Sequence, residues 1–263
     1  MKCLIAGLPG AGKTTYIGAL AYLLQNPIKG QALSLKEMPE DMSYLNKLTN
    51  PWLSLKPVDR TTRGSAYNIE LMLKNQMGEA LQLSLPDIAG EDFSSIIQNQ
   101  SGVIEGWAEK PDALLLFIKD LPAEVLAEEF DDNDTAKSDK LPTFELRHMS
   151  PAIQNLLLLR ELHNKYHWQK VAVGFSAWDM IDDMGQSPRE YLKDRSPFLN
   201  NFISHYFPDA LIFGVSSQGV DYANIGDNAD ELISKTEKGE RAYVVMEDAS
   251  KSFDLTLPLV HLI

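Results

Sequence analysis

The stretch that decides the fold is residues 1–20, MKCLIAGLPGAGKTTYIGAL. Residues 2–7 form a short apolar run ended by glycine, which predicts a buried strand. Residues 13–25 have helical spacing and stop before an Asn-Pro pair, so we expect a helix there. Between the two, GLPGAGKT fits the spacing G-x-x-x-x-G-K-[ST], with a strand before it and a helix after it. The sequence therefore predicts a loop that holds the phosphates of a nucleoside triphosphate.

The chemistry of phosphate binding explains this spacing. Glycines let successive backbone N–H groups point at phosphate oxygens, and the following helix adds the positive end of its dipole. We expect Lys13 to place a cation on the outer phosphates and Thr14 to ligate magnesium. The nucleotide-binding residues expected in this loop are Gly7, Gly10, Ala11, Gly12, Lys13, Thr14 and Thr15.

Composition narrows the class of protein and of partner. Of the 263 residues, 44% are hydrophobic and 23% are charged, as in an ordinary globular protein. A formal charge of −13 disfavours nucleic acid and anionic membranes as partners, because both need clustered basic residues. The apolar runs are too short to span a bilayer, so we expect no membrane insertion. The single cysteine, Cys3, and the lack of a secretory signal before the first strand favour a cytoplasmic location.

Strands and helices alternate along the rest of the chain. Residues 66–74 and 81–85 alternate apolar and polar side chains around a glycine-containing connector, which predicts an antiparallel hairpin. Further strands are expected at 112–120, 170–179 and 210–217, and helices at 151–167, 190–207 and near 227–238. Residues 28–58 are predicted to be irregular apart from a helix over 39–48, with Pro51 among the residues that break regular structure.

This order predicts an α/β fold. A mostly parallel sheet has helices on both faces, and the hairpin supplies one antiparallel edge strand. No repeat or linker divides the chain, so we expect a single domain over residues 1–263 with inserts near 28–58 and 120–149.

Four motifs after the phosphate loop point to a nucleotide switch. The hairpin ends in D-x-x-G, in which Asp87 can hold a magnesium-bound water and the Gly90 amide can bind the γ-phosphate. Two threonines, Thr61 and Thr62, precede the hairpin. SAWD and GVSSQG then follow two later strands, where loops that recognise a base would lie.

In this order of motifs the chain resembles the Ras-like branch of the translation-factor-related P-loop GTPases. On GLPGAGKTTYIGAL, DIAGEDF, FSAWD and the C-terminal LPLVHLI it looks most like the bacterial double-GTPase families. The resemblance implies GTP and GDP as ligands with Mg²⁺, slow hydrolysis of GTP to GDP and phosphate, and a nucleotide-dependent switch. It also implies a dedicated protein partner and a place in a bacterial conflict or defence system.

Carried over to this sequence, the resemblance gives each motif a role. Lys13 contacts the β- and γ-phosphates, and Thr14 ligates magnesium. Thr62, or its neighbour Thr61, becomes the switch threonine on magnesium and γ-phosphate. The second switch and the base site are formed by Asp87, Gly90, Asp179 and the backbone at Ser216, Ser217 and Gln218.

The base motif departs from the family pattern N/T-K-x-D. Ser176 stands for Asn or Thr, and Ala177 removes the lysine stem that packs along the base. Trp178 could compensate by stacking on the base. Asp179 either accepts hydrogen bonds from guanine or only caps the end of its strand.

Two further residues bear on catalysis. Glu91 occupies the place of a water-orienting glutamine and either positions water or is a solvated switch residue. Arg60, next to the switch threonines, is a candidate arginine finger supplied in cis, the alternative being a surface arginine that balances acidic inserts.

Two other functions use the same loop. An ATP-dependent kinase would need it too, although the hairpin and D-x-x-G argue against that class. A nucleotide-holding scaffold with negligible turnover would fit the altered base motif and Glu91.

Overall fold

The computed structural model describes residues 2–39, 41–59, 61–62, 66–98, 111–119, 121, 149–181, 185–220 and 229–263. Its strands are β1 (Cys3–Ala6), β2 (Leu33–Leu35), β3 (Ala66–Asn75), β4 (Ala80–Ile88), β5 (Ala113–Lys119), β6 (Lys170–Ser176), β7 (Leu211–Ser216), β8 (Tyr243–Val245) and β9 (Lys251–Ser252). Its α-helices are α1 (Lys13–Gln25), α2 (Ser43–Leu53), α3 (Gly90–Ile97), α4 (Pro151–Lys165), α5 (Pro188–Arg195), α6 (Pro197–Tyr206), α7 (Ala229–Glu237) and α8 (Leu257–Leu262).

The strands form a mixed sheet built around a parallel centre. One group runs in the order β1-β5-β6-β7-β8-β9, in which the first four strands are parallel and the last two pairings are antiparallel. A second, antiparallel group has the order β2-β3-β4 and meets β1 through a parallel bridge between Lys2 and Ser84. The mostly parallel α/β fold is thus confirmed, with β2, β8 and β9 adding antiparallel pairings beyond the single expected one.

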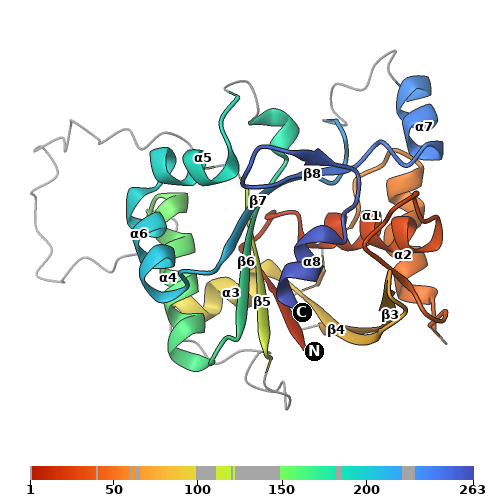
Figure 1. Cartoon of the computed structure of the whole chain (residues 1–263). Coiled ribbons are helices and arrows are strands. Elements are labelled where there is room, and N and C mark those ends of the chain that lie inside the picture. Colours follow the sequence, from red (N-terminus) through yellow and green to blue (C-terminus); the bar gives the residue numbers. More distant parts are fainter. Residues whose placement is uncertain are drawn as a thin grey trace, which may run out of the picture.

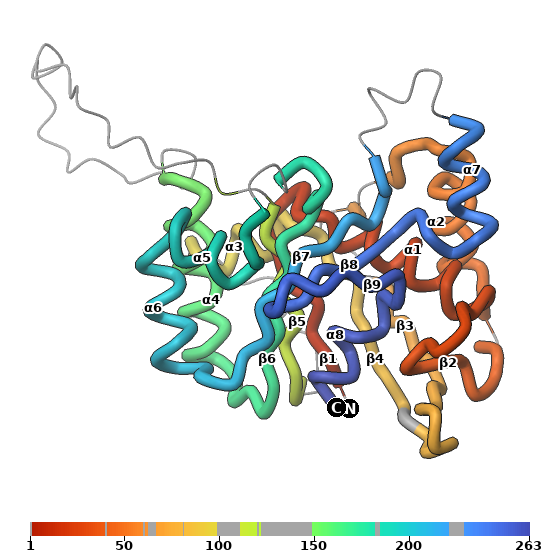
Figure 2. The backbone as a smooth tube through the Cα atoms, turned by 45° about the horizontal axis from the view of Figure 1, so that its top comes forward, coloured from red at the N-terminus to blue at the C-terminus, as the bar shows by residue number. Residues whose placement is uncertain are grey.

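Helices cover both faces of this sheet (Figure 1). One apolar cluster joins α1, α2 and α8 to the sheet, and the other joins α3, α4, α5 and α6 to its opposite face. Figure 2 shows α1, α2 and α7 grouped on one side and α4, α5 and α6 on the other. The phosphate loop lies between β1 and α1, so it opens at the edge where the parallel strands end.

Local sequence signals explain several helix boundaries. The Ser150 hydroxyl accepts a hydrogen bond from the Ile153 N–H at the start of α4, and Ser187 and Glu190 form a complete capping box on α5. The expected helix over 190–207 is divided in two, because Ser196 precedes a proline and adopts a non-helical conformation (φ −147°, ψ 75°).

The segment 28–58 is more regular than the sequence indicated. It contains β2 and α2, and the expected break at Pro51 is wrong because this residue lies within α2. A proline in the last turn removes only one backbone hydrogen bond of the helix. The next residue, Trp52, is buried, and its indole N–H donates to the Ser217 carbonyl at 2.7 Å, which fixes the end of α2 against another part of the fold. Most of the expected insert at 120–149 lies outside the described residues.

No helix in the described ranges combines the length and the apolar character that crossing a bilayer requires.

Candidate functional site

The phosphate loop packs tightly against the end of β6. Gly12 has a left-handed conformation (φ 84°), and a Cβ at this position would lie 2.9 Å from the Cβ of Ser176. Helix α1 starts at the next residue, with no acidic side chain in its first turn and no side-chain cap at its N-terminus. No side chain of α1 itself or of its N-cap therefore occupies the positive end of the helix dipole, which faces the loop, as an anion-binding site requires.

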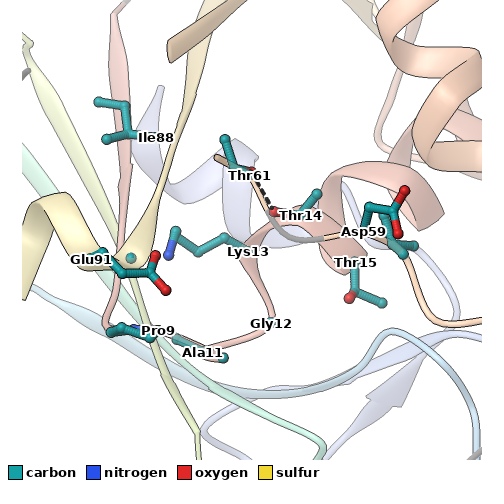
Figure 3. Close-up of a pocket in the computed structure, with 13 residues that line it drawn as sticks. Pro9, Ala11, Gly12, Lys13, Thr14, Thr15, Asp59, Thr61, Ile88 and Glu91 are labelled. Carbon is teal, nitrogen blue, oxygen red and sulfur yellow. Dashed lines mark hydrogen bonds between the residues drawn. The ribbon is translucent and has the colours of Figure 1, made fainter. Parts of the chain in front are cut away.

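Lys13 is held ready for an anion. Its side chain is only 6% exposed, and its ammonium donates to the Gly7 carbonyl at 2.8 Å. Burial lowers the pKa of Lys13 to about 8, against the opposing effect of the Asp87 and Glu91 carboxylates. In Figure 3 the side chain extends into the centre of the pocket, between Glu91 and the threonines.

This lowered pKa predicts a pH-dependent affinity for phosphates. A bound polyphosphate favours the protonated ammonium and so raises the pKa of Lys13 above about 8 in the complex. The affinity is then fully present below pH 8 and is lost as the pH rises through that value, by up to about tenfold per pH unit. Calorimetric titration with a non-hydrolysable nucleoside triphosphate between pH 7 and 9.5 measures this slope.

Lys13→Arg is the control, since a guanidinium stays charged throughout this range. Its affinity should be independent of pH, whatever its absolute value. A flat profile for the wild-type protein would show that Lys13 remains protonated in the free form.

Asp87, at the end of β4, is the centre of a cluster of oxygen atoms. It is 1% exposed, and its Oδ1 accepts from the Thr14 hydroxyl at 3.3 Å. Its Oδ2 accepts from the Thr61 hydroxyl at 3.1 Å and from the Tyr44 hydroxyl at 2.5 Å. Burial raises the pKa of Asp87, and the hydrogen bonds from Tyr44 and Thr61 oppose that change. The carboxylate is therefore buried but well supplied with donors.

This donor set fits magnesium. The Thr14 and Thr61 hydroxyl oxygens lie 3.2 Å apart beside the carboxylate, and Figure 3 marks their contact. Mg²⁺ prefers oxygen ligands and commonly takes only one or two groups from the protein, with water and phosphate oxygens completing its shell. Among the described residues there is no group of three or more His, Cys, Asp or Glu side chains that could hold a metal by itself. A phosphate-dependent magnesium site is the kind that these residues can form.

The structure brings Thr61, and not Thr62, to this cluster. Thr61 lines the phosphate pocket, whereas Thr62 is exposed and is not part of the pocket lining. The preference for Thr62 as the threonine at the metal is therefore wrong for this conformation. Arg60 lies outside the described residues, so its role as an arginine finger stays a prediction.

Gly90 and Glu91 begin α3 directly beside the loop. A Cβ at Gly90 would lie 2.5 Å from both the Cα and the N of Pro9, so only glycine lets the two backbones come this close. Glu91 lines the same pocket, a cavity of about 160 Å³. The residues around this phosphate pocket are Pro9, Gly10, Ala11, Gly12, Lys13, Thr14, Thr15, Val58, Asp59, Thr61, Ile88, Gly90 and Glu91.

A second cavity, of about 360 Å³, continues from the first. The two share Gly10, Gly12 and Thr15, so the phosphate loop forms the boundary between them. We call the second cavity the base pocket; its other lining residues are Lys119, Ser176, Ala177, Asp179, Met180, Ser217, Gln218 and Val220. A polyphosphate in the first cavity would thus lead directly to a nucleoside in the second.

Trp178 does not take part in the base pocket. Its side chain is 1% exposed and packs in the core with Phe175 and Tyr191, at ring-centroid distances of 6.2 and 5.5 Å. Gly214 lies so close beneath the ring that a Cβ there would clash with it. The expectation that Trp178 stacks on a base is therefore wrong. Ala177 has a left-handed backbone (φ 54°), and this turn directs Trp178 into the core while Asp179 lines the cavity.

The loop after β7 is fixed by its own hydrogen bonds. The Ser216 hydroxyl is buried and accepts from the Gly219 N–H at 3.1 Å, so this side chain shapes the turn and does not line the pocket. Behind the loop, Arg241 donates to the Gln218 carbonyl at 2.9 Å. Ser217 and Gln218 are thereby presented to the base pocket.

Tyr44 contacts the site directly, and sequence reasoning missed it. It lies in the expected helix 39–48, yet nothing in the pattern of that segment links it to an aspartate that follows 43 residues later. The pocket-lining residues Pro9, Val58, Asp59, Ile88, Lys119, Met180 and Val220 were not expected either.

Comparisons with known proteins identify the family of this chain. A protein-family model described as Double-GTPase 1 matches residues 4–262. No curated protein matches the chain. Among solved structures, the chain is similar to the S. cerevisiae Ski7 GTPase-like domain bound to GDP and inorganic phosphate, with 16% sequence identity and a TM-score of 0.42. That match covers 83% of this chain and 43% of the Ski7 chain. Because the family model spans nearly all of the sequence, the chain belongs to the Double-GTPase 1 family.

Proposed function

We propose that this protein binds GTP together with Mg²⁺ and hydrolyses it to GDP and phosphate, acting as a nucleotide-dependent switch. The observation that carries the proposal is the pair of adjoining cavities that share the phosphate loop. One is lined by Lys13 and by Thr14 and Thr61, whose hydroxyls donate to the buried Asp87 carboxylate. The other is lined by Asp179. Family membership supports guanine as the base.

Each residue has a defined task in this proposal. Lys13 and the amides of the loop bind the β- and γ-phosphates. Thr14 and Thr61 would hold Mg²⁺ directly and Asp87 would hold it through water. The bound ion would supply positive charge that neutralises the charge developing on the phosphates. Gly90 offers its amide to the γ-phosphate, and Glu91 accepts a hydrogen bond from the attacking water and so orients it. The water oxygen bonds to the γ-phosphorus while the bond between this phosphorus and the β–γ bridging oxygen breaks.

The base preference is tested at Asp179. In calorimetric titrations with Mg²⁺-GTPγS and Mg²⁺-ATPγS, we expect the wild-type protein to prefer the guanine nucleotide. Asp179→Ala should lower GTPγS affinity by about 10- to 100-fold, because guanine N–H donors lose a charged acceptor, and should leave ATPγS affinity nearly unchanged. Asp209→Ala, which removes an exposed carboxylate outside both cavities, is the matched control. Equal affinities for the two nucleotides in the wild-type protein would overturn the assignment of guanine.

A scaffold with negligible turnover is the second candidate. Ala177 in the base pocket and Glu91 in the phosphate pocket both depart from the pattern expected of a GTPase that turns over readily. Tight binding of GTP without release of phosphate in single-turnover experiments would favour this candidate over the switch.

We further propose that residues 1–263 act as one domain in the cytoplasm with a dedicated protein partner, within a bacterial defence or conflict system. The charge of −13 disfavours nucleic acid as a partner, and the single cysteine supports a reducing compartment. The dedicated protein partner is what the family resemblance implies. Co-purification from the native host, with GTPγS or GDP present, would identify a partner that distinguishes the two nucleotide states.

A further inference from the structure

Helix α2 delivers a phenolic hydroxyl to the centre of the proposed metal site. Tyr44, in its first turn, donates to Asp87 Oδ2 at 2.5 Å, the shortest of the three hydrogen bonds to this carboxylate. Hydrogen bonds from neutral donors to a buried carboxylate are among the stronger ones in proteins.

The tyrosine ring is held in place as well as its hydroxyl. It stacks on Tyr67 with 4.0 Å between ring centroids and 12° between the planes. Tyr67 is paired with Asp87 in the register of β3 and β4, so the ring that supports Tyr44 lies next to the carboxylate. Tyr67 is 42% exposed, whereas the other apolar residues on the same face of β3 are buried. Its contact with Tyr44 explains why an aromatic side chain occupies this exposed position.

The other end of α2 is anchored independently. Trp52 donates to the Ser217 carbonyl, and the Arg241 guanidinium lies 3.8 Å above the Trp52 ring. The helix also packs along α1, which begins at the phosphate loop. Because Trp52 anchors the far end of α2 and Tyr67 supports the Tyr44 ring, the fold holds the Tyr44 hydroxyl next to Asp87.

We propose that Tyr44 is a positioning residue for Mg²⁺: its hydroxyl holds Asp87 Oδ2 and thereby keeps the carboxylate, Thr14 and Thr61 arranged for the ion before the ion arrives. This inference rests on the proposed function, since it assigns a residue to the same site. Without Tyr44 the buried carboxylate would lose its shortest hydrogen bond and could rotate away from the threonines, so ion binding would require reorganisation.

The test compares Tyr44→Phe with Tyr67→Phe. Both changes remove one hydroxyl from the same stacked pair, but only the first removes a donor to Asp87. Each protein is first loaded with fluorescently labelled GDP, and Mg²⁺ is then added in steps. The fluorescence of the labelled GDP reports how its affinity rises with the Mg²⁺ concentration. We expect Tyr44→Phe to raise the half-saturating Mg²⁺ concentration about tenfold, the loss of one hydrogen bond to a charged group, and Tyr67→Phe to change it less than about twofold.

Two further measurements separate positioning from general damage to the fold. GDP affinity without Mg²⁺ should be the same in both variants and in the wild-type protein. In an Asp87→Asn background, adding Tyr44→Phe should have no further effect on Mg²⁺, because Tyr44 acts through Asp87. Equal Mg²⁺ dependence of Tyr44→Phe and Tyr67→Phe would overturn the inference while leaving the proposed function intact. A wild-type protein whose GDP affinity does not respond to Mg²⁺ at all would overturn both.

Discussion

Lys13→Ala should weaken the binding of GTPγS by about 100-fold, because the variant loses the buried ammonium that the phosphate loop holds at Gly7 and that we propose to bind the β- and γ-phosphates. The effect should appear in calorimetric titrations both with and without Mg²⁺, since in the proposed function the ammonium binds phosphate directly and does not act through the ion. Hydrolysis measured at GTP concentrations that saturate the wild-type protein should fall at least as far.

The matched control is Lys36→Ala, which removes a lysine from the exposed segment after β2 and away from both cavities. It should bind GTPγS as the wild-type protein does. Lys13→Ala should remain folded, because removing a buried ammonium relieves the cost of burying a charge. A variant that melts like the wild-type protein and still binds GTPγS with unchanged affinity would refute the assignment of Lys13.

The second large effect separates two adjacent threonines. Thr61→Ala should lower the single-turnover rate of GTP hydrolysis by about 100-fold, the usual consequence of removing one group that stabilises charge in a transition state. Thr62→Ala should change this rate by less than about threefold, because its neighbour supplies the hydroxyl at Thr14 and Asp87. Rapid mixing of preloaded protein with Mg²⁺, followed by measurement of released phosphate, gives both rates.

Each of these variants is the other's control, since they differ by one position in the same segment and remove the same methyl and hydroxyl groups. If Thr62→Ala were the damaging change, the segment before β3 would have to shift by one residue when nucleotide binds. That outcome would assign the described arrangement of Thr61 to the nucleotide-free protein alone.

The parts of the site that follow from local backbone chemistry could be predicted from the sequence. The loop at Gly12 and the close approach at Gly90 depend on residues that lack a Cβ, and such positions are visible as glycines at fixed spacing. The caps of α4 and α5 were equally accessible, because a side chain there bonds a backbone group three residues away.

The parts that depend on tertiary contacts could not be predicted in this way. Tyr44 meets Asp87 only because α2 packs along α1, and no spacing rule describes that contact. The left-handed backbone at Ala177 decides the direction of the Trp178 side chain. This conformation is uncommon for residues other than glycine, so the sequence does not predict it at an alanine. The choice between Thr61 and Thr62 depends on where an irregular segment crosses the end of β4, which adjacent identical residues cannot reveal.

The short outer strands of the sheet limit how copies of this chain can associate. With β4 placed beside β1 by the Lys2–Ser84 bridge, the outermost strands in the described part of the chain are β2 and β9, with three and two residues. Strands of this length expose few unpaired backbone groups, and β9 begins with Lys251, whose ammonium lies 3.5 Å above the Tyr243 ring. Edges that are short and charged are poor templates for pairing with another sheet. Sheets continued through β2 or β9 are therefore disfavoured, whereas β3 extends past β2, and its residues 66–72 pair with β4 alone among the described strands.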